Sequence, residues 1–477
     1  MLIFVCFYLI LLFLVGTVSR RRVNQLDDYY LAGRSLSMRW AVPTIVAAWF
    51  GMASVQGVAA AVYSSGMGTV LPDPFGAALA FFICALFYAG RLYKANLVTI
   101  NELIKRAYGS RLERLSSIAT LPFYIGTVAA QLVAIGYLIH SFTAQSLPIS
   151  IILAGAAAAG YTMLGGMWAV VIIDIIQLGF LVLGLVALLF PMFSEPTHLA
   201  STLDSMWNGF SELAPRSHEV HSYLTYFGQV AMTGLGGLMG QDLMQRVFAC
   251  KNRKVARRSL WISAILYLIL GLAVVLLSYY ARAVFVDVDS NDIIFALAHR
   301  VINPTALLLF VLCMLSATMS SANGYLLAGS SIVCHGLLRL QEKGKDRLLL
   351  RARLCGFGLC LVAMTLALIT QNIYGLMIHS GAFLFVSLFV PVSGALFLDR
   401  PPRKTGWASL MTGVFSWVGY VLFHYEQWGG DLDALLYAAA LVGAFMSALA
   451  YLGTYVYIRW INARRVVDVC SIADVRG

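Results

Sequence analysis

Small hydroxyl residues gather in one apolar segment, LSATMSSANGYLLAGSS, at residues 315–331. If this segment is a helix, the i, i+3, i+4 spacing places Ala317, Ser320 and Ser321 on neighbouring faces of one turn. Their hydroxyl and carbonyl oxygens could bind a hard monovalent cation such as Na⁺, for which neutral oxygen ligands suffice. Serines in apolar helices also bond back to the carbonyl four residues earlier. The pattern alone therefore leaves ion binding and simple packing both open.

Further ion ligands would have to come from backbone carbonyls freed elsewhere. Residues 39–64 (AAWFGMASVQG) and 223–241 (MTGLGGLMGQ) are interrupted by glycine where an apolar helix should be continuous, and glycine costs ~1 kcal/mol against alanine in a helix. Close helix packing through small residues is the alternative for either segment. However, the two segments are five apolar spans apart and so cross in opposite directions. Such a pair predicts an inverted repeat with a binding site at its broken helices.

The composition places these segments in a membrane. Of the 477 residues 60% are hydrophobic and 12% charged, and the mean hydropathy is +0.81. Apolar runs long enough to cross a bilayer recur along the chain without period-two alternation. We therefore predict an all-α membrane protein of about thirteen spans in a single transmembrane domain. The predicted spans are 2–18, 39–64, 75–90, 115–141, 149–162, 168–194, 223–241, 258–281, 304–336, 353–370, 373–398, 405–423 and 433–458.

The net charge of +11 follows the predicted topology. Thirty of the 33 Lys and Arg fall in segments that this topology places on one side, and only Arg216, Arg282 and Arg300 fall on the other. The positive-inside rule then puts the N-terminus outside and the C-terminus in the cytoplasm, and it makes nucleic-acid binding an unnecessary explanation of the charge. The eight scattered cysteines have no metal-binding spacing.

Four motifs resemble the solute:sodium symporter family: LDDYYLAGRSL (26–36), YTMLGGMWAVVIIDIIQ (161–177), GQDLMQRVFACKNRKVARRS (240–259) and the serine-rich segment. The likeness runs from Asp27 to about Phe397 and is somewhat closer to the high-affinity choline transporter branch than to the sugar branch. It implies a LeuT-like fold of broken helices in a 5+5 inverted repeat. Its expected parts are an N-terminal helix and loop at 1–38, a first repeat at 39–194, an inverted second repeat at 223–398, and C-terminal helices with a tail at 399–477.

The resemblance also implies where ions bind. The family's principal Na⁺ site corresponds to the carbonyls of Ala47, Phe50 and Ala317 and the hydroxyls of Ser320 and Ser321. Some members have a second cation site, for which Asp174 matches the pattern. Asn323 and Gly324 stand where that pattern has side chains such as Asp or Ser, so the sequence supports one Na⁺ better than two.

The solute site is less well defined by sequence. Trp49 matches an aromatic residue that faces choline in that branch, but the other cage positions hold Ala77, Thr127 and Gly240. Asp73, in LPDPFG, could attract a cationic group or cap a helix. Gln245 and Arg246 are interpreted as the start of a basic loop that anchors the chain at the membrane surface. The residues expected around the solute are Trp49, Ser54, Gln56, Asp73, Gln131, Thr233 and Gln241.

These features predict a sodium-coupled symporter, not an enzyme, that imports a small polar organic solute by alternating access. The solute would be an amino acid, an amine or a carboxylate. The protein would be a multi-pass protein of the plasma or inner membrane, surrounded by lipid, with no obligatory protein partner. The alternative is a transporter-like sensor or receptor that binds its solute without net transport, which accumulation under a Na⁺ gradient would distinguish.

Overall fold

The computed structural model describes residues 10, 13–143, 145–194, 196–213, 220–285, 288–338, 345–370, 373–428 and 432–474. Within these ranges the chain is helical and contains no strand. Among the described residues, nine helices are long and apolar enough to cross a membrane, and a bent helix pair makes a tenth. The all-α membrane fold is thus confirmed, whereas the number thirteen stays a prediction. The predicted span at 2–18 lies mostly outside the described residues.

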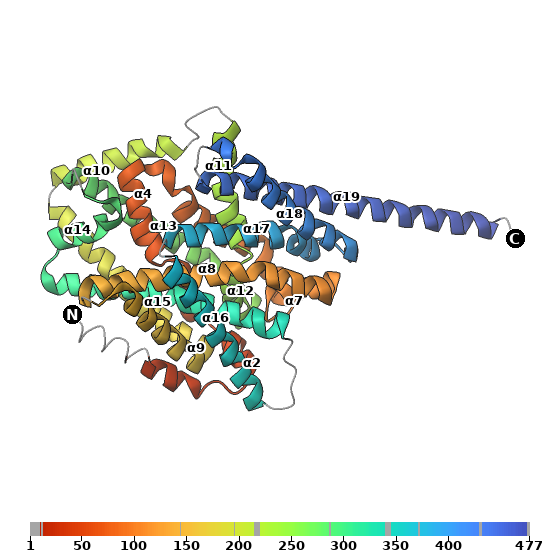
Figure 1. Cartoon of the computed structure of the whole chain (residues 1–477), viewed down its shortest axis with the longest axis horizontal. Coiled ribbons are helices and arrows are strands. Elements are labelled where there is room, and N and C mark those ends of the chain that lie inside the picture. The colour runs from red at the N-terminus through yellow and green to blue at the C-terminus, as the bar shows by residue number, and fades with distance from the viewer. Residues whose placement is uncertain are drawn as a thin grey trace.

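Long helices form the body of the molecule, and short ones cover its two ends (Figure 1). Helices α10 and α14 lie at one end, and α7 and the end of α19 lie at the other. The helices are α2 (Leu26–Leu31), α3 (Met38–Trp49), α4 (Val58–Ser65), α5 (Ala77–Ile83), α6 (Ala89–Lys94), α7 (Ile100–Tyr108), α8 (Ser110–Thr143), α9 (Leu147–Leu189), α10 (Pro196–Gly209), α11 (Val220–Ala231), α12 (Gln241–Ala249), α13 (Arg253–Val284), α14 (Ile293–Val301), α15 (Pro304–Ser331), α16 (Lys345–Ile369), α17 (Ile373–Phe397), α18 (Arg403–His424) and α19 (Leu432–Asp474).

The first predicted break lies between α3 and the helical stretch Ala53–Ser65, which meet at 60°. Phe50 ends α3 with a non-helical ψ of 75°. The N–H of Gly51 then bonds the carbonyl of Trp49, at 3.0 Å, and the N–H of Ser54 bonds that of Gly51, at 3.1 Å. In a continuous helix these two N–H groups would bond the carbonyls of Ala47 and Phe50. The break therefore removes the helical partners of two carbonyls that were expected to bind an ion.

The second predicted break lies at the GLGG sequence. Helix α11 continues through a helical turn at Met232–Gly236, Gly240 is extended (φ −62°, ψ 127°), and α12 begins at Gln241. Both predicted interruptions are thus confirmed. The predicted end of this span at residue 241 is wrong, since α12 continues the broken span to Ala249. The charged side chains of QDLMQR made this half-helix look like a surface loop.

Two family motifs that are far apart in the sequence meet at a turn within α9. Gly166 has φ 52°, which divides α9 at the boundary between the two spans predicted at 149–162 and 168–194. Tyr29 of α2 packs against this turn, and its hydroxyl donates to Met163 Sδ at 3.7 Å. Burial raises the pKa of Tyr29 well above its usual range, so the phenol stays neutral. The motifs at 26–36 and 161–177 therefore form one structural contact.

Replacing Gly166 by alanine should destabilise this contact. A Cβ at this position would lie 2.5 Å from the Tyr29 carbonyl oxygen and 2.6 Å from its Cδ2. The backbone conformation itself costs a residue with a side chain about 1–3 kcal/mol. We expect the variant to lose its folded monomer at a lower temperature in size-exclusion chromatography after heating. Gly160→Ala is the matched control, because a Cβ there meets nothing within 4 Å. Equal thermal losses in the two variants would contradict the assigned packing.

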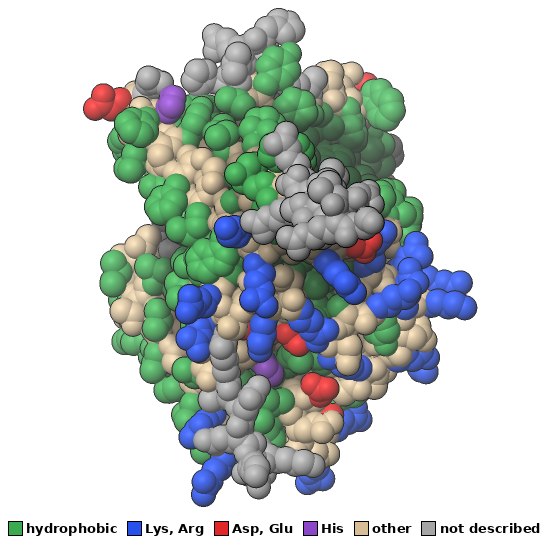
Figure 2. Space-filling model, turned by 90° about the vertical axis from the view of Figure 1, so that its right-hand side faces the viewer, with side chains coloured by type: hydrophobic (Ala, Val, Ile, Leu, Met, Phe, Trp, Pro, Cys, Tyr) green, Lys and Arg blue, Asp and Glu red, His purple; other side chains and the backbone are tan. Residues whose placement is uncertain are grey.

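The loop after α2 is fixed to the second broken span. The N–H of Leu36 donates to the Ala249 carbonyl at 3.0 Å, and the N–H of Lys251 donates to the Leu36 carbonyl at 2.9 Å. Figure 2 looks onto the end of the molecule that carries α7 and the end of α19, and Lys and Arg side chains gather on this face. This cluster of Lys and Arg side chains agrees with the charge pattern of the sequence.

Candidate functional site

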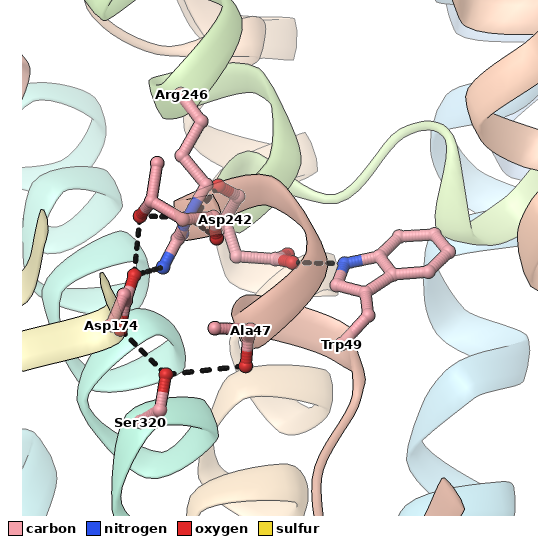
Figure 3. A network of polar contacts seen from close by, with 7 residues as sticks. Ala47, Trp49, Asp174, Asp242, Arg246 and Ser320 are labelled. Atoms are coloured by element: carbon pink, nitrogen blue, oxygen red, sulfur yellow. Dashed lines mark hydrogen bonds and ion pairs between the residues drawn. The ribbon is translucent and has the colours of Figure 1, made fainter. Parts of the chain in front are cut away.

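The proposed ion ligands meet where the break of α3 faces α15. The Ser320 hydroxyl lies 3.2 Å from the Ala47 carbonyl oxygen and donates to Asp174 Oδ1 at 2.5 Å (Figure 3). Ser320 and Asp174 are fully buried. The Ala47 carbonyl has lost its helical hydrogen-bond partner at the break, so its oxygen faces the Ser320 hydroxyl without one. The structure therefore brings Ala47, Ser320 and Asp174 into one group of oxygen atoms.

Ser321 contributes a second hydroxyl at the same break. Its side chain is 2% exposed, and its Oγ has no hydrogen-bond partner among the described residues. A Cβ placed on Gly51 would lie 2.6 Å from Ser321 Oγ and 3.7 Å from the Ala317 carbonyl oxygen. Glycine at position 51 thus lets the broken helix approach α15 closely. A buried, unpartnered hydroxyl beside freed carbonyls is the arrangement that a small cation would complete.

Arg246 lies in this network, contrary to its interpretation as a surface anchor. It is fully buried and is among the largest fully buried side chains described. Its Nε donates to the Thr44 carbonyl at 2.8 Å and its Nη1 to the Asp242 carbonyl at 2.8 Å, while its Nη2 lies 3.2 Å from Asp174 Oδ2. Thr44 also donates its hydroxyl to Asp174. The anchor interpretation is wrong because α12 extends into the protein interior, and Arg246 compensates the Asp174 carboxylate there.

The two residues expected at a second cation site do not form a direct hydrogen bond within the described structure. Asn323 Oδ1 accepts from the Thr162 hydroxyl at 2.9 Å, whereas Asp174 bonds Ser320 and Arg246. A Cβ on Gly324 would lie 3.0 Å from Arg246 Nη2. Asp174 therefore adjoins the oxygen atoms predicted to bind the first ion, whereas Asn323 faces Thr162 and Gly324 faces the Arg246 guanidinium.

A cavity of about 1020 Å³ lies directly beside the residues predicted to bind the ion. Gly51 and Ser321 line it, and it reaches Ser64 at the end of α4 and Asp292 before α14. It is therefore open toward the α10 and α14 end of the molecule. Of the residues expected around the solute, those lining this cavity are Trp49, Ser54, Gln56, Asp73, Gln131 and Thr233.

Gln241 occupies a different place from the one predicted. It is fully buried and is not among the lining residues. Its Nε2 donates to the Val98 carbonyl at 2.8 Å, its Oε1 accepts from the N–H of Ile100 at 2.9 Å, and its own N–H bonds the Tyr124 hydroxyl at 2.6 Å. Gln241 thus ties the start of α12 to α8 and to the segment before α7. These bonds close the structure on the side opposite to the cavity opening.

Several polar residues of the cavity wall were not predicted from the sequence, among them Asp242 and Tyr267. Asp242 accepts from the Trp49 indole N–H at 2.6 Å (Figure 3), and the Tyr267 hydroxyl lies 3.0 Å from Ser54 Oγ. Ser54 in turn donates to Asp73 Oδ2 at 2.5 Å. Asp242 could have been found from its position, because it is the second residue after Gly240, where the glycine-rich break ends. Nothing in the sequence distinguishes Tyr267 from the other aromatic residues of α13.

Comparison with known proteins gives the family. The family model described as "Sodium:solute symporter family" matches residues 29–413. The chain belongs to the sodium:solute symporter family. Its relatives in this family include the high-affinity choline transporter 1 of Drosophila melanogaster, with 27% identity over 408 residues, which is 81% of this chain and 64% of that protein. The human high-affinity choline transporter 1 is 26% identical over 86% of this chain and 75% of its own length, and the sodium/pantothenate symporter of Escherichia coli K12 is 25% identical over 69% and 70%.

Solved structures show the same fold for this symporter-family chain. A Na⁺-coupled sialic acid symporter in a substrate-bound, outward-open state has a TM-score of 0.78 at 17% identity, with 93% of this chain and 94% of that chain covered. Mhp1, a nucleobase-cation-symport-1 family transporter in a closed conformation, has a TM-score of 0.53 at 14% identity. The predicted family and LeuT-like fold class are therefore confirmed. The repeat boundaries and the individual site residues stay predictions.

Proposed function

We propose that this chain is a sodium-coupled symporter that imports a small polar organic solute. The observation that supports the proposal is that the same residues border both the predicted ion ligands and the solute cavity. Ser321 and Gly51 border the oxygen group at the α3 break and also line the cavity. A Na⁺ ion bound there would lie next to the solute and would hold the broken helix against α15. Ion binding would then raise solute affinity, and the solute would raise Na⁺ affinity by the same factor.

Alternating access follows from how the two ends differ. The cavity is open toward α10 and α14, while Gln241 and its bonds close the α12 side. We infer that the opening faces the outside and that the basic face carrying α7 and the C-terminal end of α19 faces the cytoplasm. The chain would work in the plasma or inner membrane without an obligatory protein partner. Release of the solute would require α12 and the segments bonded to Gln241 to separate.

Uptake into proteoliposomes tests this function. Vesicles with purified protein would be given an inward Na⁺ gradient and radiolabelled amines, amino acids or carboxylates. We expect one class of solute to accumulate above its external concentration, and we expect this accumulation to vanish in K⁺ or after a sodium ionophore. Na⁺-dependent binding without accumulation of any solute would contradict transport and would support the sensor alternative.

A further inference from the structure

We propose that the cavity takes an organic cation that carries N–H donors, that is, a protonated primary or secondary amine. This inference rests on the proposed transport function and names the class of solute. It comes from the charge of the cavity wall and from the buried acceptor atoms that the wall leaves without partners.

The cavity wall is acidic. Four carboxylates line it, those of Asp73, Asp242, Asp289 and Asp292, and among the described lining residues there is no Lys or Arg. Neither Asp73 nor Asp242 forms an ion pair with Lys or Arg within the described structure, where the nearby Arg246 pairs with Asp174 instead. Carboxylates in a low-dielectric wall attract a positive charge strongly. An anionic solute would meet these carboxylates and no Lys or Arg, since His299 is the basic side chain among the described lining residues.

Hydrogen-bond acceptors without partners at the cavity wall indicate that the cation must supply hydrogen-bond donors. Asp73 Oδ1, Gln131 Oε1 and Asp242 Oδ1 are buried atoms without a hydrogen-bond partner among the described residues. Gln131 is only 4% exposed and Asp242 only 1%, yet both line the cavity. All three atoms are acceptors, so a ligand satisfies them by donating hydrogen bonds. A protonated amine supplies these donors and the positive charge in one group.

The two carboxylates are already positioned by neutral donors. Ser54 holds Asp73 Oδ2 at 2.5 Å, and the Trp49 indole holds Asp242 Oδ2 at 2.6 Å. The Trp49 carbonyl oxygen also lies 3.2 Å from Ser54 Oγ and 3.4 Å from the Tyr267 hydroxyl oxygen. Trp49 thus connects both carboxylates through its indole and its backbone. These neutral bonds orient one oxygen of each carboxylate without adding a positive charge, and the other oxygen has no hydrogen-bond partner among the described residues.

The same wall disfavours other classes of solute. A carboxylate or a zwitterionic amino acid would place its negative group among the aspartates. A quaternary ammonium could lie against the faces of Trp49, Phe123 or Tyr325, which line the cavity. However, it has no N–H and would leave the three acceptors unpaired. The N–H requirement therefore separates this cavity from one built only for a methylated ammonium.

A matched set of ligands tests the proposal on purified full-length protein in saturating Na⁺. Ethanolamine carries a protonated amine, choline is its trimethylated form, β-alanine adds a carboxylate, and ethylene glycol is neutral. We expect titration calorimetry to give ethanolamine a Kd at least tenfold lower than that of each other ligand. Asp73→Asn and Asp242→Asn should each raise the ethanolamine Kd at least tenfold. Asp204→Asn is the control, because Asp204 is exposed on α10 and does not line the cavity.

The outcomes separate this inference from the proposed function. Choline binding as tightly as ethanolamine, tighter binding of β-alanine, or unchanged ethanolamine affinity in both cavity variants would overturn the inference. Thermal stabilisation by Na⁺ alone, retained in Asp73→Asn and Asp242→Asn, would show that these variants are folded. Na⁺-driven accumulation of an anion would support the symporter function and would refute the inference that the solute is an amine. Tight ethanolamine binding without accumulation would support the inference that the solute is an amine and would refute the symporter function.

Discussion

The Ser321→Ala variant should need at least ten times more Na⁺ than the parent chain for half-maximal solute uptake. Ser321 Oγ is buried beside the α3 break without a hydrogen-bond partner among the described residues. A hydrogen-bonding group that contacts a charge contributes about 1.5–3 kcal/mol, and 1.4 kcal/mol corresponds to tenfold in affinity. Ser320→Ala should act in the same direction, because it removes the hydroxyl between Ala47 and Asp174. The measurement is the Na⁺ dependence of initial uptake at a fixed solute concentration.

Ser330→Ala is the matched control for this prediction. Ser330 is a buried serine of the same helix, and its hydroxyl bonds the Leu327 carbonyl of its own helix at 2.9 Å. Its replacement should leave the Na⁺ dependence unchanged. If Ser320→Ala and Ser321→Ala both transport with the Na⁺ affinity of the parent chain, the ion does not bind at this break.

The Arg246→Met variant should be severely destabilised. Arg246 is fully buried and makes its ion pair with Asp174, which is also fully buried. Removing one partner of a buried pair leaves an uncompensated charge and costs about 3–5 kcal/mol. The loss of donors to the carbonyls of Thr44 and Asp242 adds to this cost. We expect less folded protein in detergent and a lower temperature of aggregation, measured by fluorescence-detected size-exclusion chromatography.

Two further variants decide whether charge compensation is the cause. Lys254→Met removes an exposed cation a few residues along the chain and should leave the aggregation temperature unchanged. The double variant Asp174→Asn/Arg246→Met should be more stable than Arg246→Met alone, because no net charge then stays buried. If the double variant is as unstable as the sum of the two single variants, Arg246 acts mainly through its bonds to the backbone.

The broken helices could be predicted from the sequence because glycine destabilises a helix at the position where it stands. The breaks at Gly51 and at the GLGG sequence could be predicted from composition and spacing alone. Arg246 could not be placed in the same way. A charged residue after an apolar span usually marks the membrane surface, and only the tertiary fold shows that α12 continues inward and meets Asp174.

The solute cavity was predictable only in part. Six of the seven expected residues line it, because the two broken helices contribute them directly or face them. Gln241 immediately follows a break and yet points to the segment before α7, where it bonds Val98 and Ile100. Asp242 is the next residue along the helix, so its side chain points in a different direction around the helix axis, and it does line the cavity. Sequence spacing cannot fix the rotation of a half-helix that begins after an irregular turn.

The contact between Tyr29 and the Gly166 turn has a consequence for how such chains can diverge. The motifs that identify this family most clearly hold one piece of scaffold together, at a distance in sequence from Asp73, Gln131 and Asp242. Substitutions at Asp73 or Gln131 would alter the cargo and leave all four motifs intact, whereas Asp242 lies within the motif at 240–259. Two members of the family can therefore share all their recognisable signatures and still carry solutes of opposite charge.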